Sequence, residues 1–220
     1  MDRLPHIPGF DAERCADYLE GTRSSPPRAQ LTRSLKHASM ARGAHALDIG
    51  CGPGKEVVEL LRAGFSVTAI DPYPSMIQST LERVKAECPL GLARLQLICS
   101  RFEDHGELLQ PRAFAVVHAG FVLPFVQSHD FDRSFDAIRR SLAVGGVFVG
   151  QLFGPNDEFV RASPPGTMSC HDAAAVKALL RGLEVLEHEE VNRSGFIGAG
   201  KPKWWHVHHI VARKSPEPQA

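Results

Sequence analysis

The feature that most restricts the fold of this sequence is a regular alternation of short apolar segments with longer amphipathic ones. The apolar segments, each expected to be a strand, lie at residues 44–49, 66–70, 94–98, 114–119 and 147–152. Helices are expected between them, for example at residues 74–87 and on the face formed by Phe131, Phe135, Ile138 and Leu142. Helices that join successive strands require right-handed crossovers, which produce a mostly parallel sheet with helices on both faces. The sequence therefore predicts a doubly wound α/β domain.

The alternation stops near the end of the chain. A helix expected at 172–181 is followed by two strand-like runs, 183–192 and 203–214, with a glycine-rich link between them. Two consecutive strands joined by a loop of about ten residues favour an antiparallel hairpin at the edge of the sheet. Residues 44–214 are thus predicted to form the main domain, and residues 215–220 a frayed tail.

The first 43 residues have a different character. They contain two short helical patterns, near 11–20 and 30–41, separated by a run of helix-breaking residues that includes Pro26 and Pro27. We predict that residues 1–43 form an N-terminal helical cap or lid.

Composition excludes several classes of protein. Lys plus Arg and Asp plus Glu both total 25, so the formal net charge is zero, and a nucleic-acid partner is not expected. The apolar runs are shorter than the roughly 18 residues that span a bilayer, and the first residues lack an apolar secretory core, so a cytoplasmic protein without a membrane partner is expected. The five cysteines are scattered without a Cys-x-x-Cys pair, which argues against a disulfide framework and a thiolate zinc site.

A glycine-rich turn follows the first predicted strand. It reads Asp48-Ile49-Gly50-Cys51-Gly52-Pro53-Gly54. Residues without side chains let the backbone bend sharply and approach a ligand. A dinucleotide-binding fingerprint would place its third glycine where Lys55 stands. Asp48 adds a carboxylate that disfavours a pyrophosphate and favours an amino group.

A second acidic residue, Asp71, ends the second predicted strand. A carboxylate at this point can accept hydrogen bonds from both hydroxyls of a ribose. Together with the glycine turn, Asp71 predicts a ligand that is a nucleoside with an amino-acid-like appendage.

With these residues the chain resembles the class I S-adenosylmethionine-dependent methyltransferases. The resemblance extends over residues 44–214, and its most specific motif is the segment 47–54. It implies a Rossmann-like, doubly wound, mostly parallel seven-stranded sheet that ends in an antiparallel hairpin and carries helices on both faces. It also implies S-adenosyl-L-methionine as cofactor and S-adenosyl-L-homocysteine as product.

The resemblance also implies which residues hold the cofactor. The methionine part would lie over Gly50, Cys51 and Gly52, with Asp48 near its amino group. The ribose would bind Asp71, and Met76 would pack on the adenine. The remaining expected contacts are Pro72, the adenine-edge loop Arg101, Phe102 and Glu103, and the strand-end residues His118 and Ala119. Many relatives place an acidic residue where Arg101 stands, which leaves Glu103 or the backbone to reach the adenine amine.

Three further segments resemble the tellurite-resistance-type small-molecule methyltransferases. They are Gly120-Phe121-Val122-Leu123-Pro124-Phe125, Gly150-Gln151-Leu152-Phe153-Gly154 and Lys203-Trp204-Trp205-His206-Val207-His208-His209. The pair Pro26-Pro27 also fits this subgroup. An Arg often precedes those prolines, whereas here the residue is Ser25, with Arg23 and Arg28 nearby.

Two histidines are candidates for the chemistry. His118 ends the fourth predicted strand, beside the expected cofactor crevice, where an imidazole can accept a proton or bind the cofactor. His206 and His208 share one face of the last strand, and His206 is a candidate substrate contact. No acidic or cysteine partner for these imidazoles is identifiable in the sequence, so no metal site is predicted.

The predicted function is transfer of a methyl group from S-adenosylmethionine to a small molecule. The acceptor atom stays open among oxygen, nitrogen, sulfur and a chalcogen oxyanion, and so does the oligomeric state. Two alternatives stay open: a non-catalytic S-adenosylmethionine-binding sensor domain, and a nicotinamide-dependent oxidoreductase, which the glycine spacing disfavours.

Overall fold

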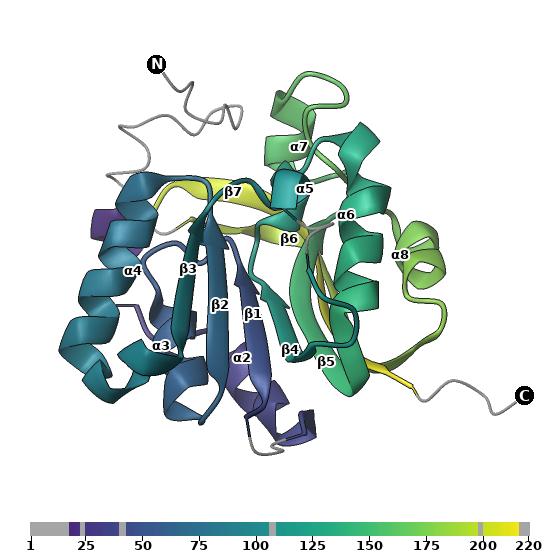
Figure 1. Cartoon of the computed structure of the whole chain (residues 1–220). Coiled ribbons are helices and arrows are strands. Elements are labelled where there is room, and N and C mark those ends of the chain that lie inside the picture. Colours follow the sequence, from purple (N-terminus) through teal and green to yellow (C-terminus); the bar gives the residue numbers. More distant parts are fainter. Residues whose placement is uncertain (1–17, 23–24, 40–42, 106–108, 198–199, 216–220) are drawn as a thin grey trace, which may run out of the picture.

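Figure 1 shows the computed structural model of the chain, which describes residues 18–22, 25–39, 43–105, 109–197 and 200–215. The strands are β1 (His45–Ile49), β2 (Ser66–Asp71), β3 (Leu95–Cys99), β4 (Phe114–Ala119), β5 (Leu142–Phe153), β6 (Leu183–Phe196) and β7 (Pro202–Lys214). The α-helices are α2 (Ala29–Ser34), α3 (Lys55–Arg62), α4 (Pro74–Glu87), α5 (Phe102–His105), α6 (Ser128–Ser141), α7 (Glu158–Ala162) and α8 (Ala173–Leu179). Short 3₁₀ helices are η1 (Leu35–His37), η2 (Pro89–Arg94) and η4 (Leu123–Phe125).

The strands form a seven-stranded sheet in the order β3-β2-β1-β4-β5-β7-β6. Neighbouring strands from β3 to β5 are parallel, whereas β7 is antiparallel to both β5 and β6. The predicted doubly wound sheet with its antiparallel hairpin is therefore confirmed. The strand order reverses between β1 and β4, and open α/β sheets bind ligands at such a switch point, beyond the carboxyl ends of the strands.

Most element boundaries agree with the sequence pattern, and α4 and β4 have the predicted bounds. Leu142 differs, because it begins β5 rather than ending the preceding helix, and it pairs with Phe114. This strand therefore begins before the expected start at residue 147, and Gly145 and Gly146 lie inside it. A Cβ atom on Gly146 would stand 2.7 Å from the carbonyl oxygen of Phe114, so a glycine is needed where β5 runs close to β4.

The N-terminal segment is helical in two stretches that the structure describes. Residues 18–22 are helical, and α2 continues into η1, so that this helical stretch ends at His37. Residues 11–17, which carry the rest of the first helical pattern, lie outside the described residues, as do 216–220 of the expected tail.

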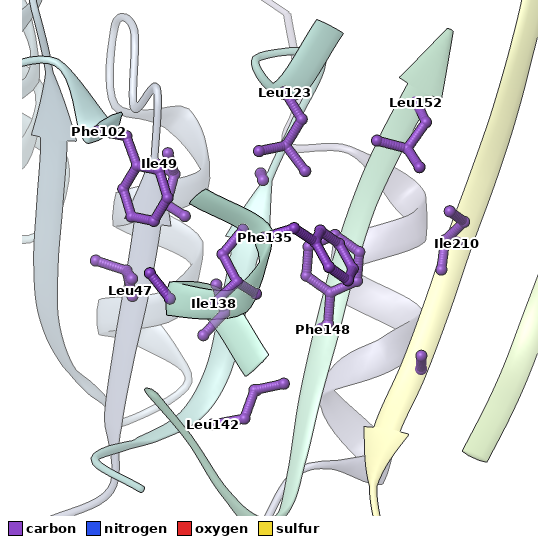
Figure 2. Packing of buried hydrophobic residues seen from close by; sticks show 14 of the residues in the cluster. Leu47, Ile49, Phe102, Leu123, Phe135, Ile138, Leu142, Phe148, Leu152 and Ile210 are labelled. Atoms are coloured by element: carbon purple, nitrogen blue, oxygen red, sulfur yellow. The ribbon is translucent and has the colours of Figure 1, made fainter. Parts of the chain in front are cut away.

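Each face of the sheet has its own hydrophobic core. On one face, side chains of α6 and α8 pack on the strands, and Figure 2 shows Phe135 of α6 against Phe148 of β5, with ring centroids 5.5 Å apart. On the other face, residues of α2, α3 and α4 form the second core. Side chains alternate along a strand, so Leu47 and Ile49 lie in the first core and Ala46 in the second. Asp48, between Leu47 and Ile49, therefore faces the side of α2 and α3.

None of the helices in the described part of the chain combines the length and the apolar character that a bilayer crossing requires.

Candidate functional site

The glycine turn between β1 and α3 depends on conformations that glycine adopts readily. Gly50, Gly52 and Gly54 have φ angles of 68°, 52° and 79°. The backbone N–H groups of Gly50 and Cys51 both donate to the carbonyl oxygen of Ile70, at 2.8 and 3.1 Å, which fixes the turn against β2. A Cβ atom on Gly54 would lie 2.8 Å from the Thr80 side chain of α4. The spacing of the glycines thus follows from the backbone geometry of the turn.

Asp71 lies beside this turn at the end of β2. Its Oδ2 accepts a hydrogen bond from the backbone N–H of Gly52 and its Oδ1 accepts one from that of Tyr73, both at 3.0 Å. Burial raises the pKa of Asp71 to about 6, and these two hydrogen bonds oppose the rise. Each carboxylate oxygen keeps accepting capacity, so the group is oriented to receive two further donors.

Asp48 and His118 form a buried pair at the switch point. They are opposite each other in the β1–β4 ladder, and His118 Nδ1 lies 2.7 Å from Asp48 Oδ1. Burial raises the pKa of Asp48, and His118 opposes the rise. In the neutral ring, Nδ1–H donates to Asp48 and Nε2 is an acceptor. Among the described residues, neither His118 Nε2 nor Asp48 Oδ2 has a hydrogen-bond partner.

These two unpaired acceptors fit a cationic donor. A buried acceptor without a partner costs free energy, so both atoms favour a ligand that brings N–H groups to the switch point. The amino group of S-adenosylmethionine is such a donor. His118 Nε2 lies on the side of Gly120, because a Cβ atom there would stand 3.0 Å from it.

Arg28, just after the proline pair, reaches the same region. Its backbone N–H donates to Glu56 Oε1, and its guanidinium group lies 4.6 Å from the centroid of the Phe121 ring. Tyr18 covers the turn from outside, since a Cβ atom on Gly52 would be 3.6 Å from its Cε1. Burial raises the pKa of Tyr18, and Arg28 opposes the rise. No sequence motif pointed to Tyr18, and Arg28 was indicated only through the nearby prolines.

Three residues expected around the adenine make contacts that the structure describes. Met76 is buried, and it packs with Tyr73 and the half-buried Leu19. Arg101 and Glu103 form an ion pair at 2.6 Å.

Most of the other expected cofactor contacts have buried side chains. Phe102 and Ala119 belong to the core beneath α6 (Figure 2 labels Phe102 there), so only their backbones are free to reach a ligand. Pro72 is half-buried after β2. Burial raises the pKa of the Cys51 thiol well above its usual range, and it lies 3.6 Å from Thr80 Oγ1, which fits a packing role.

An aromatic group extends from the end of β4 toward β7. Phe121 has a φ of 58°, a conformation uncommon for a residue with a side chain, and its N–H donates to Gln151 Oε1. Its ring makes edge contacts with Phe153, Trp205 and His209, with centroids 6.1, 5.9 and 6.0 Å away. The sequence motifs contained these residues, but their mutual contact depends on strand pairing.

A buried ion pair lies against Trp205 of this aromatic group. Lys203 Nζ lies 2.7 and 2.6 Å from the two carboxylate oxygens of Asp157, and 3.6 Å from the centroid of the Trp205 ring. Asp157 also caps α7 by accepting from the N–H of Phe159. Burial lowers the pKa of Lys203, and Asp157 opposes the fall. The pair therefore fastens α7 to β7.

The two predicted catalytic histidines do not meet. Strand alternation places His118 on the face of α2 and α3, and His206 on the face of α6 and α8. His206 Nδ1 accepts from the N–H of Asn156, and its Nε2 lies 2.8 Å from Glu190 Oε1. Glu190 is the acidic neighbour that the sequence did not reveal, because only the pairing of β6 with β7 brings it there.

Comparison with known proteins finds a family match and one curated relative. Residues 46–146 match the family described as methyltransferase domain. Over 176 residues the chain is 29% identical to trans-aconitate 2-methyltransferase of Paracidovorax citrulli, an alignment that covers 75% of this chain and 61% of that protein. The chain thus spans about three fifths of the length of this curated relative.

Solved structures of low identity share the fold. TehB from Haemophilus influenzae superimposes with a TM-score of 0.71 at 17% identity, over 91% of this chain and 67% of that one. Phosphoethanolamine N-methyltransferase 2 of Haemonchus contortus, in complex with S-adenosyl-L-methionine, gives 0.69 at 16% identity, over 94% and 58%.

The fold, the glycine turn and the family match point to one class of protein. Residues 46–146 match a methyltransferase domain, and the chain is similar to the class I S-adenosylmethionine-dependent methyltransferases, as the sequence motifs indicated. Its structure is similar to that of TehB.

Proposed function

We propose that the chain transfers a methyl group from S-adenosylmethionine to a small-molecule acceptor. The observation that carries the proposal is the buried Asp48–His118 pair, whose two unpaired acceptors lie beside the glycine turn. They match a ligand with a cationic amino group better than a ligand with a pyrophosphate at that end.

Different residues of the site are assigned to different parts of the cofactor. We assign Asp48 to the amino group and Asp71 to the ribose hydroxyls. We assign Arg28, whose Nε lies 3.8 Å from Glu56 Oε1, to the carboxylate of the methionine part, and Tyr18 and Met76 to the nucleoside. The described parts of the N-terminal segment, 18–22 and 25–39, act in this proposal as a cap over the cofactor.

Methyl transfer mainly requires the protein to align the methyl donor with the acceptor. The bound cofactor supplies an electrophilic methyl group on a sulfonium centre. The protein holds the acceptor in line and keeps water away, which favours an aromatic surface such as that of Phe121, Phe153 and Trp205. Because Asp48 Oδ2 is assigned to the amino group of the cofactor, we assign His118 Nε2, on the side of Gly120, to take a proton from an acceptor that must lose one.

A small-molecule acceptor is supported by the relatives. Their names specify trans-aconitate and phosphoethanolamine as substrates of those proteins. For this chain, the proposal is limited to an acceptor small enough to lie against the aromatic group between β4 and β7.

Calorimetric titration tests the proposal. Purified protein is titrated with S-adenosylmethionine, with S-adenosylhomocysteine and, as a control, with NADH. We expect micromolar binding of both sulfur nucleosides and none of NADH, followed by turnover in a screen of small acids, amines, thiols and chalcogen oxyanions. Binding of NADH alone would identify an oxidoreductase. Binding of the sulfur nucleosides without turnover on any acceptor would indicate a sensor domain.

A further inference from the structure

A second cluster of polar side chains lies on the hairpin, on the face opposite to Asp48 and His118. In the β6–β7 ladder, Glu190 is opposite His208 and His188 is opposite Ile210, so these side chains share the face that carries His206. One ligand atom from each of Glu190, His206 and His208 lies within 4.8 Å of the others. His188 Nε2 is 3.1 Å from His208 Nδ1. We propose that this cluster binds a divalent transition metal such as Zn²⁺, with His188, Glu190 and His208 as its ligands.

The hydrogen bonds of His208 leave the correct nitrogen for a metal. Its Nε2 lies 3.1 Å from the carbonyl oxygen of His171, which can only accept, so Nε2 carries the proton and Nδ1 has the lone pair. A backbone carbonyl that receives the other ring N–H is the usual support of a metal-binding histidine. The side chain is fully buried, which holds the ring in place.

The spacing of the two imidazoles also fits. Two nitrogen atoms bound to one tetrahedral zinc ion at about 2.0–2.1 Å are about 3.3 Å apart. His188 Nε2 and His208 Nδ1, at 3.1 Å, are close to that separation. Without metal, His188 Nε2–H donates to His208 Nδ1. The exposed His188 ring offers its lone pair to a metal by moving this proton to its other nitrogen, so no proton has to leave the pair.

His206 orients the carboxylate instead of binding the metal. Its Nδ1 accepts from the backbone N–H of Asn156, so its Nε2 carries the proton and donates to Glu190 Oε1 at 2.8 Å. Hydrogen bonds of this kind fix ligating carboxylates. The resulting set of two imidazole nitrogens and one carboxylate suits zinc and other transition metals better than Mg²⁺ or Ca²⁺. Because β6 is an edge strand with Glu190 exposed, a further position of the metal faces solvent.

Calorimetric titration of tag-free protein with Zn²⁺ alone tests the site. We expect one zinc ion per chain, with affinity weakened about tenfold or more by His188→Ala and by Glu190→Gln. Both positions are on the exposed edge strand, so the variants are expected to fold. Glu189→Gln is the matched control, because it removes the same charge one residue away on the opposite face and is expected to leave the affinity unchanged.

Two further readouts complete the test. Zinc at a hundredfold excess over its dissociation constant is expected to raise Tm by about 5 to 10 °C in the parent protein, and this gain is expected to disappear in Glu190→Gln. Loss of zinc binding in a Cys99→Ser/Cys170→Ser variant would assign the metal to the exposed thiols and overturn the proposal. Absence of stoichiometric binding, or equal weakening by Glu189→Gln, would also overturn it. The same variants are also titrated with S-adenosylhomocysteine, which is expected to bind them as it binds the parent protein. Failure of the zinc proposal and failure of the methyltransferase proposal can then be told apart.

Discussion

At the scale of single residues, the orientation of Asp71 leads to a prediction about cofactor affinity. Two backbone N–H groups fix its carboxylate beside the glycine turn. We expect Asp71→Ala to weaken binding of S-adenosylhomocysteine by about 1 to 3 kcal/mol, because a buried ligand hydroxyl loses its acceptor. Calorimetric titration of the folded variant measures the change. Unchanged affinity would exclude a ribose contact.

The raised pKa of Asp71 predicts a pH dependence of the same binding. The ionised carboxylate is the better acceptor for two hydroxyls, and in the free protein it becomes protonated as pH falls through about 6. Cofactor affinity is therefore expected to be constant above about pH 7 and to fall below pH 6, by at most about tenfold per pH unit. Asp71→Asn is expected to remove this step. A step that persists in the variant would belong to another group.

Because the folded-state pKa of Asp71 exceeds the ordinary value of 3.8, the folded protein binds more protons than the unfolded chain between these two values. The contribution of Asp71 to the free energy of unfolding therefore decreases as pH rises through that range. The site thus holds a carboxylate at some cost in stability, as is common for functional residues.

Variants of His118 are expected to affect turnover and cofactor binding differently. Its Nδ1 is committed to Asp48, and its Nε2 lies on the side of Gly120. We expect His118→Ala to lower kcat by a larger factor than cofactor affinity, because a proton acceptor is lost. His118→Asn keeps a donor for Asp48, and so controls for the cost of leaving that buried carboxylate unpaired. Equal loss of turnover and of cofactor affinity in both variants would show that His118 only lines the pocket and does not take a proton.

At the scale of elements, the Lys203–Asp157 pair predicts how firmly α7 is attached. Asp157→Ala leaves a buried ammonium group unpaired, and we expect it to lower the free energy of unfolding by about 3 to 5 kcal/mol. Glu184→Ala breaks the exposed pair with Arg213 and is expected to cost less than about 1 kcal/mol. Denaturant unfolding of both variants measures the contrast. Similar losses would mean that the aromatic rings around Lys203 compensate for its missing partner.

Local patterns predicted the elements well. The helix α4 begins at a proline and follows a helical periodicity, and β4 is a short apolar run, so both had clear boundaries in the sequence. The spacing of Leu142 from Ile138 fits either a helix or a strand, so its element is ambiguous in the sequence, whereas its burial in the core is not.

Contacts between distant strands were not predictable from spacing alone. Asp48 meets His118 through the β1–β4 ladder, and Glu190 meets His206 through the β6–β7 ladder, which also contains an irregularity between Val185 and Glu187. A shift of register by one residue would send either side chain to the other face of the sheet. The sequence therefore indicated the cofactor turn, which is local, but missed the metal-binding arrangement and the aromatic group, which are not.

At the scale of the whole molecule, the two cores share one sheet, and this predicts cooperative unfolding. Strands such as β1 and β4 are buried on both faces, so loss of either core exposes apolar surface that also supports the other. Phe148→Ala in one core and Leu60→Ala in the other are expected to cost about 3 to 5 and 2 to 5 kcal/mol. For a chain of this size, a loss of 1 kcal/mol lowers Tm by about 2 to 4 °C. We therefore expect each core variant to lower the Tm of one common unfolding transition. Scanning calorimetry checks this, with the exposed Leu90→Ala as a control that leaves Tm nearly unchanged. Two resolved transitions, each moved by only one core variant, would show that the faces unfold separately.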